Sequence, residues 1–485
     1  MAVAGVLGVA LTAGGLTSGT DRALADPSPG ASQNQSRSGG AKPKAPSNRQ
    51  APPAAAPRAV ATGGPVLAAA VDGADTLPQT QGLQRDLAQV LGDKALGTLN
   101  FAIADGSTGR FLYGAGENTP ATPASTTKLL TAVAALALIP ADSRIATRVV
   151  KGGAPGEITL IGGGDPTVTA LPPDQIRVGG MPVDAESAPA SLPELARQTA
   201  AALKSSGTTT VKLAYDTSLY SGPLLHKEHD AMNIAAVTPL MVDEGRIDPL
   251  SPDEAPARVF DPADQAAETF AGLLKAQGIT VDGKAKPAPA APGAQQLAVV
   301  NSPTMPRLVE RMLTTSDNTL AEAVARQAAV AAHQPASFDG GVAAVIQTLQ
   351  KLGVPTAGVV LNDGSGLHTG NLISPLVLAE VLGAAASPRH PELRPVLTGL
   401  PIAGFTGTLL TRFGAASGAQ SVAGIVRAKT GTLGGSGVYT LAGTVVDADG
   451  RVLVFAIMSR AVADGASSRA ASDRIVARLA ACGCR

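Results

Sequence analysis

The chain has 485 residues, of which 45% are hydrophobic and 16% charged, and its 38 Lys and Arg residues balance its 38 Asp and Glu residues. A net charge of zero provides no electrostatic attraction to nucleic acid, and it argues equally against a polybasic protein of the membrane surface. At about 100–200 residues per domain the length predicts two or three domains, with a core of Ala, Val, Leu and Ile because aromatic residues make up only 2%.

The first 25 residues predict an export signal or an N-terminal anchor. Residues 2–14 are an unbroken run of apolar and small residues. Such a run is shorter than the about 20 residues that span a bilayer and fits the about 7–15 residues of a signal-peptide core. The Ala-Leu-Ala sequence at 23–25 offers a cleavage site, although no Lys or Arg precedes Arg22. A cleaved signal, an uncleaved anchor and a short buried helix stay open as alternatives.

Residues 26–79 predict a disordered tether. They are rich in Pro, Ala, Ser, Gln and Gly and contain no aromatic residue. A segment of this composition buries too little apolar surface to offset the entropy lost on ordering. We therefore expect it to space a folded domain from a membrane or cell wall.

Strands and helices at both ends of the remaining chain bracket a middle region of alternating strand-like and helix-like segments. The helix from 124 to 140 carries no charge after Lys128, so we expect it to be buried nearly all round. Two hairpins are expected where turns containing Gly join apolar strands. The expected elements are a helix at 82–93, a hairpin of 98–104 and 110–113, the helix at 124–140, helical stretches at 303–313 and 319–333, a hairpin of 438–446 and 451–458, and a helix at 468–481.

The two cysteines, Cys482 and Cys484, lie in the last four residues. They are too few and too terminal for a disulfide framework or for a metal site of four thiolates. A bridge between them would close a very small, strained ring. We interpret them as a tail of unknown redox state.

Ser125 and Lys128 form the first motif whose residues could carry out a reaction. A spacing of three places both side chains on one helix face, and apolar neighbours lower the pKa of the lysine by desolvation. Lys128 can then be the neutral base that takes the proton of a nucleophilic Ser125. The pattern is weak alone, because roughly two chance Ser-x-x-Lys matches are expected in a chain of this length.

The second motif is Ser316-Asp317-Asn318, in a polar break between two helical stretches. Ser316 there can pass a proton to a leaving group, and the amide of Asn318 can bind both the lysine and the substrate. The same Ser-x-Asn pattern also occurs in the expected tether at 32–34, so this motif too is weak by itself.

The third motif is Lys429-Thr430-Gly431, followed by Thr432 and lying before the last hairpin. On an edge strand, Lys429 and Thr430 can hold a substrate carboxylate, and Gly431 leaves room for a close backbone approach. The amide of Thr432, together with that of Ser125, can form an oxyanion hole. The order and combination of all three motifs favour catalysis over coincidence.

The three motifs together are typical of the penicillin-recognising serine enzymes. The chain resembles the class C low-molecular-mass penicillin-binding proteins, the serine D-alanyl-D-alanine carboxypeptidases and endopeptidases, over about residues 82–460. The blocks that carry this resemblance are Asn118–Lys128, Gly162–Pro166, Tyr215–Ser218, Met312–Asn318, Asp363–Leu367 and Lys429–Leu433.

The resemblance implies an α/β (α+β) fold, in which an antiparallel sheet with flanking helices forms a β-lactamase-like transpeptidase domain interrupted by an inserted α/β domain. We expect the catalytic domain at 80–147 and 300–485 and the insert at 148–299. The implied protein is an exported, cell-envelope serine hydrolase of peptidoglycan stem peptides, without cofactor or metal, in which β-lactams trap Ser125. The sequence leaves the oligomeric state open.

Other interpretations are retained. A β-lactamase or esterase of the same superfamily would need a deacylating base, and no carboxylate in the sequence is assigned to that role. A catalytically idle wall-binding scaffold would keep the fold without the chemistry. His226-x-x-His229-Asp230 could place two imidazoles on one helical face as metal ligands, but no third ligand is evident, so a solvated polar loop is the favoured interpretation.

Overall fold

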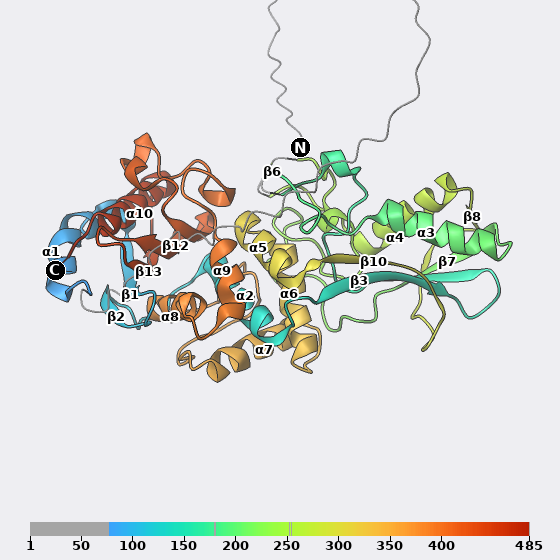
Figure 1. Cartoon of the computed structure of the whole chain (residues 1–485), viewed down its shortest axis with the longest axis horizontal. Coiled ribbons are helices and arrows are strands. Elements are labelled where there is room, and N and C mark those ends of the chain that lie inside the picture. Colours follow the sequence, from blue (N-terminus) through green and yellow to red (C-terminus); the bar gives the residue numbers. More distant parts are fainter. Residues whose placement is uncertain (1–76, 179–180, 252, 254, 485) are drawn as a thin grey trace, which may run out of the picture. The chain divides into compact units, whose positions relative to one another are not determined.

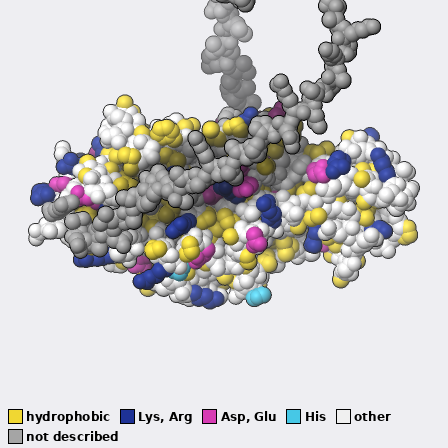
Figure 2. All heavy atoms as spheres, in the orientation of Figure 1, with side chains coloured by type: hydrophobic (Ala, Val, Ile, Leu, Met, Phe, Trp, Pro, Cys, Tyr) yellow, Lys and Arg dark blue, Asp and Glu magenta, His cyan; other side chains and the backbone are white. Residues whose placement is uncertain are grey.

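The computed structural model describes residues 77–178, 181–251, 253 and 255–484. The predicted signal or anchor and all but the last three residues of the predicted tether lie outside these residues. Within the described ranges, no helix is both long and apolar enough to cross a membrane. In the view of Figure 2, Lys and Arg side chains lie interspersed with Asp and Glu over the described surface.

Five antiparallel strands from the two ends of the described chain form one sheet (Figure 1). The N-terminal hairpin joins the C-terminal one through a long strand pair, in which Thr98 faces Arg460. Both predicted hairpins are confirmed. In their order across the sheet the strands are β11 (Arg427–Leu433), β12 (Val438–Val446), β13 (Val452–Arg460), β1 (Thr98–Asp105) and β2 (Phe111–Ala115).

Alternate residues of the sheet point to two different hydrophobic cores. Ala102 and Ala104 of β1 face one core, while Phe101 and Ile103 face the other. The helices on the alanine side are α2 (Lys128–Leu138) and α8 (Pro375–Ala386), and those on the aromatic side are α1 (Thr80–Leu91) and α10 (Gly465–Ala480). The result is an antiparallel sheet with flanking helices, as the sequence predicted.

Helix α2 is surrounded by other helices. Residues 128–136 are all buried, which confirms the expectation drawn from their lack of charge. Each neighbouring helix packs directly on α2, so α2 is held in place from several directions. Besides α8, these neighbours are α5 (Met305–Thr315), α6 (Asn318–Ala331), α7 (Phe338–Lys351) and α9 (Arg394–Thr398).

A second sheet is built from the chain between α2 and α5. Its central pairs, β4 with β7 and β7 with β8 and β9, are parallel, whereas β3 pairs antiparallel with β10 and β4. Figure 1 shows helices α3 (Leu192–Ser205) and α4 (Pro262–Ala276) beside these strands. The strands are β3 (Arg144–Lys151), β4 (Glu157–Ile161), β7 (Thr210–Asp216), β8 (Thr280–Val281), β9 (Lys286–Pro287) and β10 (Gln296–Thr304), and a separate pair consists of β5 (Arg177–Val178) and β6 (Met181–Pro182).

The predicted domain boundaries at 147/148 and 299/300 fall within β3 and β10, two strands that pair with each other. The division of the chain into a split catalytic domain and an insert stays a prediction.

The C-terminal cysteines do not form a loose tail. Cys482 and Cys484 are 1% and 3% exposed and pack in the core next to α1 and α10, with their side chains directly beside each other. The carbonyl of Cys484 accepts a 2.7 Å hydrogen bond from the backbone N–H of Gln79. A side chain at Gly82 would meet that same carbonyl, so a glycine in α1 allows the chain end to pack here.

Strand β11 packs against the short 3₁₀ turn that precedes α2. The hydroxyl of Thr440 in β12 donates a 2.8 Å hydrogen bond to the carbonyl of Pro123 in this region. A Cβ atom at Gly431 of β11 would meet Thr440 Oγ1, the carbonyl of Pro123 and the Cβ of Ala124. Glycine is therefore needed at 431 for the strand to lie this close to the turn.

We predict that Gly431→Ala lowers the free energy of unfolding by about 1–3 kcal/mol, because an added methyl group overpacks the contact between β11 and the turn. Thermal unfolding should show a lower midpoint for this variant. Gly435→Ala is the matched control, since no atom lies within 4 Å of its Cβ position. Equal midpoints for the two variants would contradict the packing argument.

Candidate active site

Ser125 and Lys128 lie where the 3₁₀ turn (Ala124–Thr127) meets α2. Ser125 is partly exposed, whereas Lys128 is completely buried, and Lys128 Nζ lies 2.9 Å from Ser125 Oγ. Ala124, directly before the serine, has a φ of 49°, a strained conformation held by the packing around the turn. The three-residue spacing thus brings a lysine nitrogen to a serine hydroxyl at the edge of the core.

Oxygen atoms from three parts of the chain lie around Lys128 Nζ. Besides Ser125 Oγ they are Asn318 Oδ1 at 2.6 Å and the backbone carbonyl of Ser365 at 2.7 Å. The first and second motifs therefore meet at one nitrogen atom. The Ser365 carbonyl belongs to the Asp363–Leu367 block, which carries the family resemblance and for which the sequence predicts no catalytic role.

The second motif lies at the junction of α5 and α6, in the polar break that the sequence predicted. Ser316 ends α5 with a φ of 61°, and Asp317 caps α6 by accepting a 2.9 Å hydrogen bond from the backbone N–H of Leu320. Burial alone would raise the pKa of Asp317, but the guanidinium groups of Arg258 and Arg246 hold it well below its usual range. The Asp317 carboxylate is therefore ionised and fixed, which holds the neighbouring residues of the motif in place.

The third motif lies along the edge strand β11. Lys429 is completely buried, and its Nζ donates to Ser316 Oγ at 2.7 Å and to the carbonyl of Thr430 at 2.9 Å. The hydroxyl of Thr430 lies 2.7 Å from that of Thr408. The second and third motifs are thus joined directly by a lysine–serine hydrogen bond.

All eight candidate residues gather at one cavity of about 730 Å³. Lys128 and Lys429 lie behind its wall, each hydrogen-bonded to a lining serine, and Gly431 packs against the turn below. The candidates that line the cavity are Ser125, Ser316, Asn318, Thr430 and Thr432. One cavity thus presents two serine hydroxyls, an amide and two threonines, each serine with a lysine nitrogen within 3 Å.

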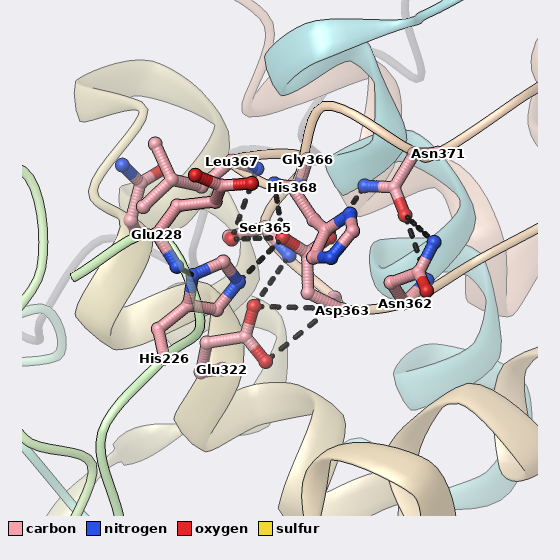
Figure 3. Close-up of polar contacts among 12 residues, drawn as sticks. His226, Glu228, Glu322, Asn362, Asp363, Ser365, Gly366, Leu367, His368 and Asn371 are labelled. Carbon is pink, nitrogen blue, oxygen red and sulfur yellow. Dashed lines mark hydrogen bonds and ion pairs between the residues drawn. The ribbon is translucent and has the colours of Figure 1, made fainter.

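The two histidines considered as metal ligands have different surroundings. His229 lines the cavity, whereas His226 is buried, with Nε2 2.8 Å from Asp363 Oδ2 and Glu322 close by (Figure 3). These three side chains could approach one cation, but N–H groups already occupy their carboxylate oxygens. The cluster fits a hydrogen-bond network better than a metal site.

Charge in this network is divided unequally between the two carboxyls. Burial raises the pKa of Glu322, and the nearby Asp363 carboxylate raises it further. Burial also acts to raise the pKa of Asp363, but hydrogen bonds from His226, from the backbone N–H of His368 and from Asn371 lower it to about 2. Asp363 is therefore the ionised member of the pair.

The chain is similar to known carboxypeptidases along nearly its whole described length. A family model described as the D-Ala-D-Ala carboxypeptidase 3 (S13) family matches residues 83–254 and 248–482. A carboxypeptidase of Mycobacterium tuberculosis is 38% identical, covering 86% of this chain and 88% of that protein. Carboxypeptidase DacB of Mycolicibacterium smegmatis is 36% identical, covering 90% of this chain and 91% of that protein.

The fold is similar to that of penicillin binding protein 4 from Haemophilus influenzae. Its crystal structure matches with a TM-score of 0.64 at 22% identity, over 83% of this chain and all of that one. A second crystal structure of it, complexed with a β-lactam, matches with a TM-score of 0.60. Since the family model and the mycobacterial relatives cover most of the chain, it belongs to the D-Ala-D-Ala carboxypeptidase 3 (S13) family, the class C penicillin-binding proteins, and is a serine-type D-Ala-D-Ala carboxypeptidase.

Proposed function

We propose that this enzyme is exported and removes the terminal D-Ala of peptidoglycan stem peptides through an acyl-enzyme formed on Ser125. The observation that carries the proposal is the 2.9 Å contact between Ser125 Oγ and Lys128 Nζ at the wall of the cavity. A serine next to a nitrogen base is the arrangement that activates a hydroxyl as a nucleophile.

Lys128 is the general base in this proposal. A neutral amine has two N–H groups and one lone pair. Asn318 Oδ1 and the Ser365 carbonyl can only accept hydrogen bonds, so each of them faces an N–H of the amine. Of the Ser125, Asn318 and Ser365 oxygens at Nζ, only the Ser125 hydroxyl can donate, so its proton can face the lone pair of the amine, which is the geometry required for removing it.

The departing amine and the substrate carboxylate lie on the Ser316 side of the cavity. Ser316 relays the proton to the amine, and Lys429 and Thr430 bind the C-terminal carboxylate. The 2.7 Å contact between Lys429 Nζ and Ser316 Oγ supports this assignment, because it places a cation and a proton donor side by side.

The oxyanion forms at the backbone N–H groups of Ser125 and Thr432. Asn318 supports Lys128 with its Oδ1 and binds the substrate amide with its Nδ2. Because β-lactams mimic the acyl-D-Ala-D-Ala group, we expect them to acylate Ser125 as well.

We predict that Ser125→Ala abolishes labelling by penicillin while the protein stays folded, because a small side chain at a cavity wall contributes little packing. Intact-mass measurement after incubation with penicillin tests this. A mutant that still gains one drug mass contradicts the assignment of the nucleophile. In the wild type, a stable adduct supports the carboxypeptidase mechanism, rapid turnover of the adduct supports a β-lactamase, and no labelling supports an idle scaffold.

The second prediction concerns the substrate carboxylate. A charged hydrogen bond contributes roughly 1.5–3 kcal/mol, so Lys429→Ala should lower kcat/KM for a D-Ala-D-Ala peptide by at least about tenfold. A peptide with an amidated C-terminus cannot form the ion pair and should lose much less on mutation. Measuring both enzymes against both peptides gives a double-change cycle. Strict additivity of the two losses would mean that Lys429 does not bind the carboxylate.

A second cavity favours cross-link endopeptidase activity as an additional function. This cavity, of about 530 Å³, adjoins the proposed leaving-group side of the first one. Thr315 lines it next to Ser316, and Thr408 lines it while its hydroxyl lies 2.7 Å from that of Thr430. A carboxypeptidase releases one D-Ala, whereas an endopeptidase releases a residue attached to a second stem peptide, which needs room on this side.

We predict that Leu410→Trp, which fills part of the second cavity from an exposed position, impairs only the cleavage of cross-links. Cleavage of a cross-linked stem dimer should fall at least about tenfold in kcat/KM, with D-Ala release from a pentapeptide within about twofold of wild type. Leu219→Trp, at another exposed position, is the control. Equal effects on both reactions would argue against a leaving-side role for this cavity.

A further inference from the structure

One loop, residues 226–233, contacts two of the three elements that surround Lys128. At its start, His226 Nε2 lies 2.8 Å from Asp363 Oδ2, and at its end the carbonyl of Asn233 accepts a 3.0 Å hydrogen bond from Asn318 Nδ2. Residues 227–230, between these two contacts, line the catalytic cavity. We call residues 226–233 the anchored loop.

The partners of His226 determine which of its nitrogens carries the proton. The backbone N–H of Glu228 donates to Nδ1 at 3.0 Å, so Nδ1 is an acceptor. The proton is then on Nε2, which donates to Asp363. The ring is 2% exposed and packs edge-on against Phe338, with 5.4 Å between the ring centroids. His226 is therefore a fixed, directional donor to Asp363.

Asp363 organises the turn that presents the Ser365 carbonyl to Lys128. Figure 3 shows Asp363 among the residues of this turn. Its Oδ1 accepts from the backbone N–H of Gly366 at 2.9 Å, and its Oδ2 accepts from that of His368 at 2.7 Å. From the other side, Glu322 accepts from the backbone N–H of Ser365 at 2.8 Å. Holding Asp363 therefore fixes the position of the carbonyl that binds Lys128.

The other end of the anchored loop determines which end of the Asn318 amide faces Lys128. An amide has an oxygen that accepts and a nitrogen that donates. Because the Asn233 carbonyl takes an N–H of Asn318, the oxygen of Asn318 faces Lys128, at 2.6 Å. The anchored loop thus helps to orient both Asn318 Oδ1 and the Ser365 carbonyl, the two oxygens that accept hydrogen bonds from Lys128.

We propose that the anchored loop is a positioning element for Lys128 and that His226 is a positioning residue, which acts through Asp363 and the Ser365 carbonyl. This inference rests on the proposed role of Lys128 as the base. The loop holds the two acceptors, Asn318 Oδ1 and the Ser365 carbonyl, in place at Nζ, and so favours an amine whose lone pair faces the Ser125 hydroxyl. The loop also forms part of the cavity wall, so groups that contact the substrate and groups that orient the base belong to one short segment.

The test compares His226→Asn with His226→Gln. Asparagine keeps an acceptor near the position of Nδ1 but is too short to donate to Asp363, whereas glutamine can place a donor near the position of Nε2. A misplacement of about 1 Å can cost roughly a hundredfold in rate. We therefore expect the rate constant of penicillin acylation at saturation to fall about 10- to 100-fold in His226→Asn, with unchanged non-covalent binding, and glutamine to restore most of it.

The control is His390→Ala, which removes another His–carboxylate contact, the 3.2 Å pair of His390 Nδ1 with Glu392 at the surface. It should acylate at the wild-type rate. If His226→Asn does not fold, His226→Phe replaces it, because phenylalanine keeps the ring packing and lacks both nitrogens. The same loss of rate is expected there.

A wild-type acylation rate in His226→Asn, or in His226→Phe, overturns the proposal, and so does an equal loss in the Asn and Gln variants. A loss confined to non-covalent binding also overturns it, because positioning of the base affects the chemical step. A separate variant tests the proposed role of Lys128 as the base: if that role is wrong, Lys128→Ala would retain the wild-type acylation rate.

Discussion

The arrangement of the active site depends on one buried nitrogen atom. Lys128 Nζ is hydrogen-bonded to a side chain three residues earlier and to oxygens of Asn318 and Ser365, far along the sequence. A buried amine is costly unless its hydrogen bonds are satisfied. The need to satisfy Lys128 therefore ties the turn before α2, the start of α6 and the Asp363–Leu367 turn to one another.

Around this nitrogen, buried carboxylates are held by specific partners. Asp317 is held by Arg258 and Arg246, and Asp363 by His226. Breaking a buried pair leaves an uncompensated charge, so each pair makes the local geometry rigid. The proposed proton transfer between Ser125 Oγ and Lys128 Nζ, which lie 2.9 Å apart, needs rigid surroundings, because small displacements reduce the rate strongly.

His226 and Arg258, which hold these two carboxylates, come from the chain between the first and second motifs. That region supplies part of the wall of the catalytic cavity. Its Arg258 holds Asp317 of the second motif, and its His226 holds Asp363. Elsewhere at the cavity, close packing requires a residue without a side chain: Gly431 allows β11 to lie against the turn that carries Ser125. The contacts of these buried carboxylates and the close glycine contact thus both help to define the cavity.

Local sequence determined the elements and the spacing of Ser125 and Lys128. Apolar runs and Gly-containing turns fixed both hairpins, and the lack of charge after Lys128 fixed α2 as a buried helix. The order of the three motifs indicated the family. Only the tertiary structure decided that Ser365 offers its carbonyl to Lys128, that His226 pairs with Asp363 and that the C-terminal cysteines lie in the core. These contacts join residues far apart in the chain, and a backbone carbonyl or a single histidine leaves no periodic pattern in the sequence from which such a contact could be predicted.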